Sequence, residues 1–105
     1  MSVRYGDDVA ADFAAIRSHG IDRWGVRRTL DFLAGFEEAL QRLVEQPRMR
    51  RRRDDFGAGL RSVRFNPYQV FYLIVDEDVV IVAVIHERRN HSALDFADRM
   101  AGPRD

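Results

Sequence analysis

The spacing of hydrophobic positions is helical between residue 7 and Pro47 and changes to a strand pattern from residue 60. In residues 7–46 apolar side chains recur every three or four positions, which predicts two amphipathic helices. The first is expected to end at Gly20, since glycine readily takes the left-handed conformation that closes a helix. The second is expected to begin around Trp24 and Gly25 and to stop at Pro47. These signals predict a helical hairpin, with Trp24 as a core residue at its turn.

Strand patterns lie on both sides of this hairpin. Residues 1–6 alternate polar and apolar side chains and predict a short opening strand. Residues 60–86 contain the runs LRSVRF, YQVFYLIV and VVIVAVI, separated by an Asn-Pro turn and an acidic turn. Connections this short join antiparallel neighbours, so a three-stranded meander is expected. Together the elements predict an α+β fold in one domain spanning residues 1–105.

The last two strands carry apolar side chains on both faces, whereas strands in a sheet covered on one side alternate apolar and polar side chains. One helical hairpin covers one face, so something else is expected to cover part of the second. Residues 92–101 form a possible short helix that supplies some of this cover. The remainder is either satisfied within the chain or left for a partner chain, and the pattern leaves both open.

Composition excludes several classes of protein. The chain has no cysteine, which removes disulfide scaffolds and thiol catalysis and fits a reducing compartment. Its longest apolar run is far shorter than the roughly 20 residues that span a bilayer, and its first residues lack a signal sequence. We therefore expect a cytoplasmic protein without membrane association.

Charge is balanced overall but unevenly placed. The net charge is zero, and residues 47–61 carry six arginines against two aspartates. A neutral chain lacks the general field that gathers nucleic acid, so a specific protein partner is favoured over general nucleic-acid binding. The run RMRRRR is interpreted as a solvated loop that steers a partner by charge, although a patch for nucleic acid or an acidic partner is the alternative.

The segment HERRNH, residues 86–91, raises the question of a zinc site. Zinc hydrolases of the helical type place two histidines four residues apart, so that both reach one metal. Here His86 and His91 are five apart, and the preceding run reads as a strand. With one further histidine and no cysteine the ligand set is incomplete. We expect neither a metal nor a cofactor.

The order of these elements carries a family resemblance. The chain resembles the ParE branch of the ParE/RelE toxin superfamily in the order of its segments. These are a strand, a helical hairpin ending at Pro47, the basic connection RMRRRRDDFGAG, Leu60-Arg61, the strand FYLIV and a last strand ending in IHERRN. This branch belongs to type II toxin–antitoxin, or plasmid stabilisation, systems. The resemblance covers residues from Val3 to Phe96, and it implies the RelE/ParE-like fold.

The resemblance also implies a function. It implies a toxin held inactive by a ParD-like antitoxin in a hetero-oligomer, with DNA gyrase as the target and replication as the process blocked. A degenerate member that only binds its antitoxin is a weaker possibility. No catalytic residue is expected under this interpretation. The residues expected to bind antitoxin or target are Arg61, Arg64, Tyr72, His86, Arg88, Arg89 and Phe96.

The alternative is a RelE-like, ribosome-dependent mRNA endoribonuclease. Its catalytic residues would be Arg61, His86, Arg88 and Arg89, which match the family's basic positions. Such chemistry needs cations to stabilise charge on phosphate and a group that moves a proton. RelE-type chains commonly carry a tyrosine soon after the last strand, and here no tyrosine follows Tyr72. Tyr72 itself is most simply a core residue whose hydroxyl reaches an edge.

Overall fold

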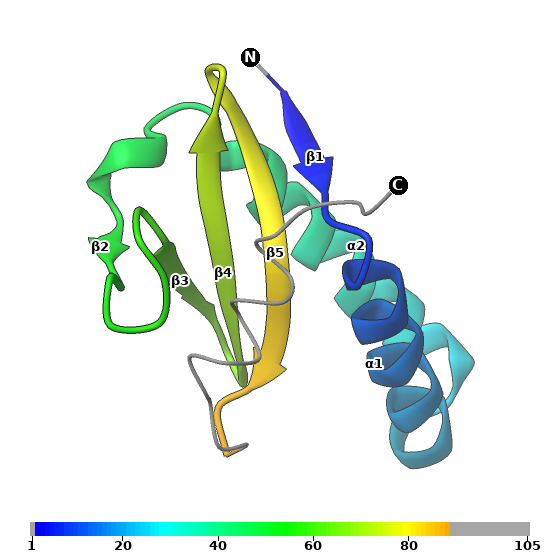
Figure 1. Cartoon of the computed structure of the whole chain (residues 1–105). Coiled ribbons are helices and arrows are strands. Elements are labelled where there is room, and N and C mark those ends of the chain that lie inside the picture. Colours follow the sequence, from blue (N-terminus) through cyan, green and yellow to red (C-terminus); the bar gives the residue numbers. More distant parts are fainter. Residues whose placement is uncertain (1, 89–105) are drawn as a thin grey trace.

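The computed structural model describes residues 2–88, which fold into two helices and a five-stranded sheet (Figure 1). Both predicted helices and all four predicted strands are present, which confirms the α+β fold. A 3₁₀ turn and one further short strand lie in the arginine-rich connection. The elements are β1 (Val3–Tyr5), α1 (Val9–Trp24), α2 (Val26–Arg42), η1 (Pro47–Met49), β2 (Arg51–Arg52), β3 (Arg61–Phe65), β4 (Tyr68–Val75) and β5 (Asp78–His86).

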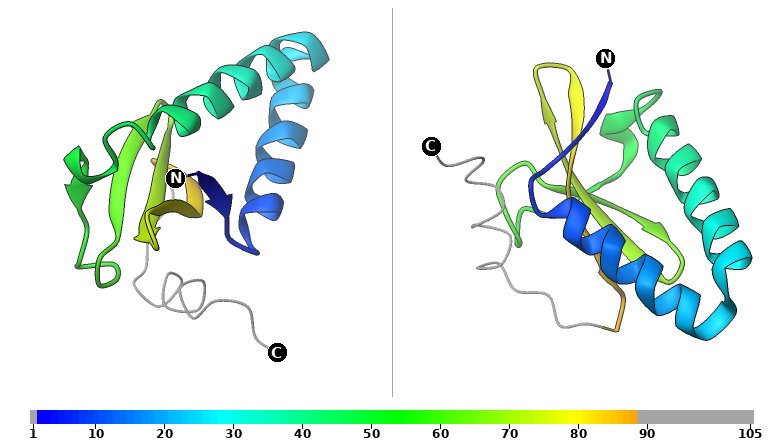
Figure 2. Two further views of the ribbon diagram at one scale, coloured as in Figure 1. Left: turned by 90° about the horizontal axis from the view of Figure 1, so that it is seen from above. Right: turned by 90° about the vertical axis from the view of Figure 1, so that its right-hand side faces the viewer.

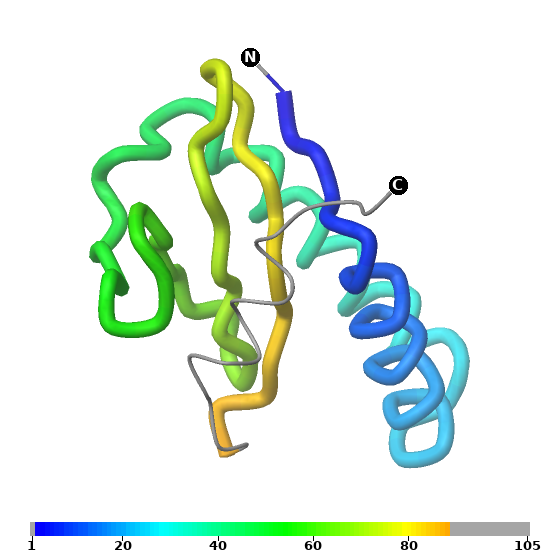
Figure 3. Tube along the Cα trace, viewed as in Figure 1, coloured from blue at the N-terminus to red at the C-terminus, as the bar shows by residue number. Residues whose placement is uncertain are grey.

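The sheet is mixed, with the order β1-β5-β4-β3-β2. Strands β2 to β5 are antiparallel neighbours, as expected for the meander, whereas β1 runs parallel to β5 and pairs Val3 with Val79. The small antiparallel sheet expected from the meander is therefore extended by a parallel strand at this edge. A parallel pair needs a long crossover, and the helical hairpin belongs to that crossover. Figure 3 shows β1 beside β5, with β2 at the far edge.

The main core lies between α2 and one face of the sheet. Phe36 is fully buried, and its ring centroid lies 4.5 Å from that of Phe65 and 6.1 Å from that of Tyr68. Phe32, one helical turn earlier, packs against the same two rings. Figure 2 shows α2 over this face of the sheet and α1 beside the edge formed by β1 and β5. The helical spacing in the sequence thus places an aromatic cluster on the sheet.

A partly buried carboxylate contact fastens α1 to the sheet edge. Strand β1 pairs with β5 only through Ile81, so the later part of β5 has no strand on that side within residues 2–88. The backbone N–H of Val84 donates to a carboxylate oxygen of Asp12 at 3.0 Å. Helix α1 therefore satisfies a strand-edge donor that would otherwise lack a partner in this part of the sheet.

The hairpin differs from the prediction at Gly20 and Trp24. Helix α1 continues through Gly20 to Trp24, and Gly25, with φ of 88°, makes the break between the helices. Gly20 instead permits close packing, because a Cβ there would lie 2.8 Å from the Thr29 hydroxyl. The side chain of Trp24 is 44% exposed, so its prediction as a core residue was wrong. Helix α2 ends at Arg42, short of the predicted boundary at residue 46.

The second face of the sheet has its own small core, as the apolar side chains on both faces of the last two strands indicated. Phe71 is fully buried there, and Phe56, from the connection between β2 and β3, packs on it with a centroid distance of 5.8 Å. This connection therefore supplies part of the cover. The helix predicted over residues 92–101 lies outside the described residues. The buried members of this cluster are Leu60, Phe71, Val82, Ala83 and Ile85.

Candidate binding surfaces

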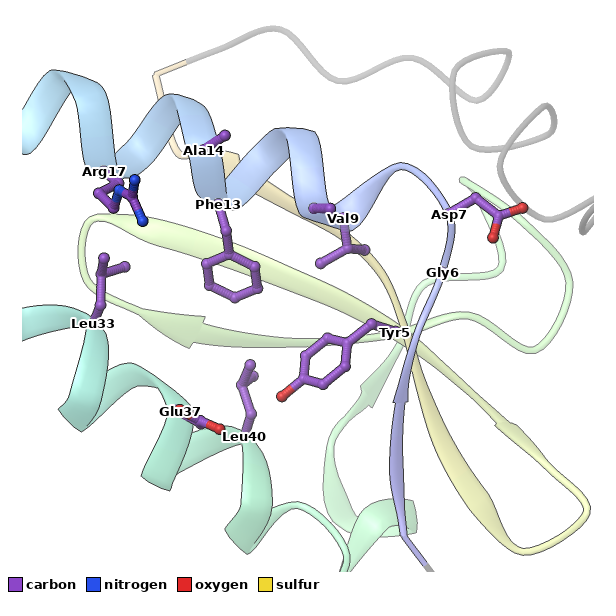
Figure 4. Close-up of a pocket in the computed structure, with 11 residues that line it drawn as sticks. Tyr5, Gly6, Asp7, Val9, Phe13, Ala14, Arg17, Leu33, Glu37 and Leu40 are labelled. Carbon is purple, nitrogen blue, oxygen red and sulfur yellow. The ribbon is translucent and has the colours of Figure 1, made fainter.

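An open groove lies between β1 and the two helices, and Figure 4 shows the side chains around it. Its volume is about 790 Å³. Val9 and Leu40 are buried at its base, and the rings of Tyr5 and Phe13 meet edge to face at 6.3 Å within it. The floor is therefore apolar and aromatic. The remaining lining residues are Gly6, Asp7, Ala10, Ala14, Arg17, Leu33 and Glu37.

The rim of this groove is charged on both sides. Arg17 lies on α1, and Glu37 lies across from it on α2 (Figure 4). The pKa of Tyr5 is raised, first by burial and then by the nearby Glu37 carboxylate, while a hydrogen bond with Gln41 opposes the rise. An apolar floor with opposite charges on facing rims fits an amphipathic segment, whose apolar side chains enter while its charged ones pair at the edges.

The sequence did not single out this groove, although it marked the residues that make it. Phe13 and Leu40 belong to the helical stripes, and Tyr5 belongs to the opening strand. Their helical or alternating spacing predicts burial but does not show which positions stay open between two helices. The groove depends on the placement of β1 parallel to β5, which the local pattern did not predict.

Arg61 is bound to the backbone of its own chain. Its guanidinium Nη1 donates to the carbonyl oxygens of Arg48 at 3.0 Å and of Arg50 at 2.8 Å. These contacts hold the turn η1 and the start of β2 against β3. As a result, the charge of Arg61 serves local structure, and its donors at Nη1 already have acceptors.

Tyr72 is a core residue, as the sequence suggested for its side chain. It is fully buried, and its hydroxyl donates to the carbonyl of Pro47 at 2.6 Å. Burial raises the pKa of this hydroxyl, while Arg61 and Arg50 oppose the rise. Tyr72 therefore holds the arginine-rich connection in place through Pro47, and its side chain is not accessible to a partner.

His86 lies at the far end of the sheet from Arg61. His86 pairs with Tyr68, and Arg61 pairs with Tyr72, so the two are separated by four residues of β4. That separation is about 13 Å along the strand, before the strand-to-strand distance is added. The His86 ring stands edge-on to Tyr68 at 5.5 Å, and its Nδ1 accepts from the backbone N–H of Arg88 at 3.1 Å. The structure does not bring the two basic sites together.

The remaining predicted residues fall into two groups. Arg64 lies on β3 and pairs its guanidinium with the Glu87 carboxylate at 2.9 Å and with the Asn66 side-chain oxygen at 3.0 Å. It stands opposite Gln69 and therefore faces the side of the sheet away from Arg61. Arg89 and Phe96 lie outside the described residues. Among the predicted residues that the structure describes, Arg61 lies opposite Tyr72 at one end of the sheet, and His86 and Arg88 are joined by a hydrogen bond at the other.

Metal sites and membrane spans are two further possibilities for the described part of the chain. Residues 2–88 contain no group of three or more histidine or carboxylate side chains arranged to hold a metal ion. Over the same residues, neither helix combines the length and apolar character needed to cross a bilayer. The features that stand out there are the groove and the arginine-rich edge.

These features define a class: a small α+β protein with a helical hairpin crossing over a mixed sheet. Residues 3–91 match the model of the ParE toxin of the type II toxin–antitoxin system parDE. The chain therefore belongs to the ParE toxin family.

Individual relatives agree with this assignment. The chain is 31% identical to toxin ParE1 of Mycobacterium tuberculosis over 68 residues, which cover 64% of this chain and 69% of the relative. It is 38% identical to toxin ParE3 of Caulobacter vibrioides over 69 residues, covering 66% and 69%. A solved structure of a chromosomal ParDE system from P. aeruginosa has the same fold, with a TM-score of 0.72 and 19% identity over 82% of this chain and 95% of that one.

Proposed function

We propose that this chain arrests bacterial growth by binding DNA gyrase in the cytoplasm, and that a ParD-like antitoxin blocks it by filling the groove between β1, α1 and α2. The family assignment supports a toxin of a type II pair. The apolar floor and charged rims of the groove support an amphipathic antitoxin segment as its occupant. The toxin and antitoxin would then form a hetero-oligomer.

The placement of Arg61 is the observation that favours a binding function over catalysis. A ribonuclease would need Arg61 and His86 close to one phosphate, with free guanidinium donors to stabilise its charge. Here Arg61 donates to two backbone carbonyls, and His86 lies four residues farther along β4. The missing tyrosine after Tyr72 points the same way. His86, Arg88 and Arg64 then remain as contact residues for target or antitoxin.

The target is tested by inducing the chain alone in a bacterial host. DNA and protein synthesis are followed separately by pulse labelling in the first minutes after induction. Early loss of DNA synthesis, with translation persisting and an SOS response, is the expected result. Early loss of translation with mRNA cut at ribosomal positions would instead establish the endoribonuclease, and His86→Ala would then abolish the arrest. Purified gyrase and the purified chain give the direct check in a supercoiling assay.

The groove is tested by a matched pair of substitutions on α1. Ala14 lines the groove and Ala15, its exposed neighbour, does not. We expect Ala14→Trp to remain toxic but to escape neutralisation by the antitoxin encoded beside this chain, since the indole fills the groove. Ala15→Trp is expected to remain toxic and to be neutralised normally. If both variants are neutralised alike, the antitoxin binds elsewhere.

A further inference from the structure

The arginine-rich edge of the sheet is a second surface, separate from the groove. Residues 48–53, which we name the arginine ledge, contain η1 and β2 and read RMRRRR. The ledge lies at the β2 end of the sheet, opposite the β1 edge beside the groove (Figure 1). The sequence favoured a solvated loop here, and β2 corrects that expectation for Arg51 and Arg52.

Hydrogen bonds and strand pairing tie the ledge to β3 and β4. The hydroxyl of Tyr72 donates to Pro47, and the guanidinium of Arg61 donates to the carbonyls of Arg48 and Arg50. Next to these contacts, the backbone of β2 pairs with β3, placing Arg51 opposite Ser62. A surface held in place before binding loses less conformational entropy when a partner arrives.

The cations of the ledge are only partly neutralised. Arg52 pairs with Asp54 at 3.0 Å, and that carboxylate also accepts from the backbone N–H of Gly59, which lowers the pKa of Asp54. Arg48 and Arg53 have weaker pairings of 3.8 Å and 3.5 Å with Glu77 and Asp55. Within residues 2–88, Arg50 and Arg51 have no carboxylate within salt-bridge distance. These two exposed arginines are the free charges of the ledge.

The ledge also offers backbone groups and an apolar contact. Strand β2 is the last strand in the described sheet, so its outer edge carries backbone donors and acceptors without a strand partner there. Beside it, Met49 is 74% exposed. An open strand edge, free arginines and an exposed flexible apolar side chain together match an extended peptide that carries carboxylates.

We propose that the arginine ledge binds an extended acidic segment of a protein partner, which adds to the sheet beside β2 and places carboxylates against Arg50 and Arg51. Guanidinium and carboxylate groups form paired hydrogen bonds, so the arginines select acidic side chains while the strand edge fixes the direction of the segment. Glu77, Asp54 and Asp55 surround the ledge, and the chain has zero net charge. Because these carboxylates pair with Arg48, Arg52 and Arg53, only a few cations of the ledge are left free. A peptide with one or two carboxylates matches this small number better than a nucleic acid, which carries a charge at every phosphate.

The test uses the full chain labelled with ¹⁵N and a short synthetic peptide of alternating glutamate and valine. We expect amide shifts confined to the ledge and β3 on titration, with slower hydrogen exchange in β2. Arg51→Glu should weaken binding about tenfold or more, because it replaces attraction with repulsion. Arg28→Glu, an equal change of charge at an exposed position on α2, should leave the affinity within about twofold.

Two other probes define the results that would overturn the proposal. A peptide with glutamine in place of glutamate should not bind, and a short oligothymidylate should bind more weakly than the acidic peptide. Tighter binding of the oligonucleotide would make the ledge a nucleic-acid surface. If Arg51→Glu and Arg28→Glu lose equal affinity for the acidic peptide, the binding depends on net charge and not on the ledge. Neither outcome bears on gyrase or the groove, because the assay contains only the chain and the probe.

Discussion

Two tyrosines on the same face of β4 differ in what their hydroxyls do. Tyr72 is fully buried and donates to Pro47, whereas Tyr68 is almost as buried but has no hydrogen bond within residues 2–88. We expect Tyr72→Phe to lower the free energy of unfolding by about 1–2 kcal/mol, because the Pro47 carbonyl loses its donor. Urea denaturation measures the change.

Tyr68→Phe is the matched control for this prediction. It removes the same atom from the same strand, but no partner in the described structure loses a hydrogen bond. Its effect on the free energy of unfolding should stay within about 0.5 kcal/mol. If the two variants lose equal stability, the contact between Tyr72 and Pro47 adds nothing. A larger loss at Tyr72, by contrast, assigns to it the anchoring of the arginine ledge.

At the scale of elements, the two helices meet where Gly20 faces Thr29. We expect Gly20→Ala to destabilise the protein by about 1–3 kcal/mol, because the added Cβ would lie 2.8 Å from the Thr29 hydroxyl and 2.9 Å from its methyl group. Alanine's better helix propensity, about 1 kcal/mol, offsets only part of this. Gly35→Ala in α2 meets nothing within 4 Å and should stabilise the protein by about 0.5–1 kcal/mol. Thermal or urea unfolding distinguishes the two, and a stabilising Gly20→Ala would contradict the close packing.

The attachment of β1 depends on a carboxylate at the start of β5. Asp78 accepts from the backbone N–H of Ser2 at 2.8 Å and from its hydroxyl at 3.1 Å. The first of these bonds is the largest cause that lowers the pKa of Asp78 below its ordinary 3.8. A lowered pKa stabilises the fold at pH values above 3.8, and this contribution is lost as the pH falls through the folded-state pKa.

Acid should therefore loosen β1 before it unfolds the sheet. We expect hydrogen exchange in β1 to lose protection below about pH 4, relative to the centre of β5. Asp78→Asn should show weaker protection of β1 at neutral pH and little further change on acidification. An unchanged pH profile in this variant would assign the acid sensitivity to another carboxylate.

The sequence predicted elements better than it predicted their contacts. Periodicity was sufficient for the helices and the meander, because spacing alone distinguishes a helical stripe from alternation. It was insufficient at Gly20, because a single sequence does not distinguish a glycine that ends a helix from one that lets another helix pack closely. It also failed at Trp24, whose exposure depends on where the hairpin extends beyond the sheet.

The same limit applies to the candidate site. The basic character of Arg61 and His86 was visible in the sequence, but their separation follows from the register of β3, β4 and β5. The use of Arg61 depends on the carbonyls of Arg48 and Arg50, which only the turn η1 directs toward it. The groove requires β1 to lie parallel to β5. These are relations between distant segments, and local spacing carries no information about them.

At the scale of the whole molecule, the groove and the ledge lie at opposite edges of one sheet. Four strand spacings separate β1 from β2, about 19 Å at the usual spacing. This exceeds the distance over which substitutions usually influence each other, about 7–10 Å. If the antitoxin occupies the groove alone, as proposed, the ledge stays open and Arg50 and Arg51 remain exposed.

This independence predicts additive behaviour in a double variant. Ala14→Trp should impair neutralisation by the antitoxin without changing the affinity for the acidic peptide, and Arg51→Glu should do the reverse. The double variant should show both losses with a coupling below about 0.5 kcal/mol, because the altered side chains share no contact. Peptide titration and growth under co-expression measure the two effects separately. A coupling well above that value would mean that one partner spans both edges of the sheet, and the antitoxin would then be the source of the acidic segment.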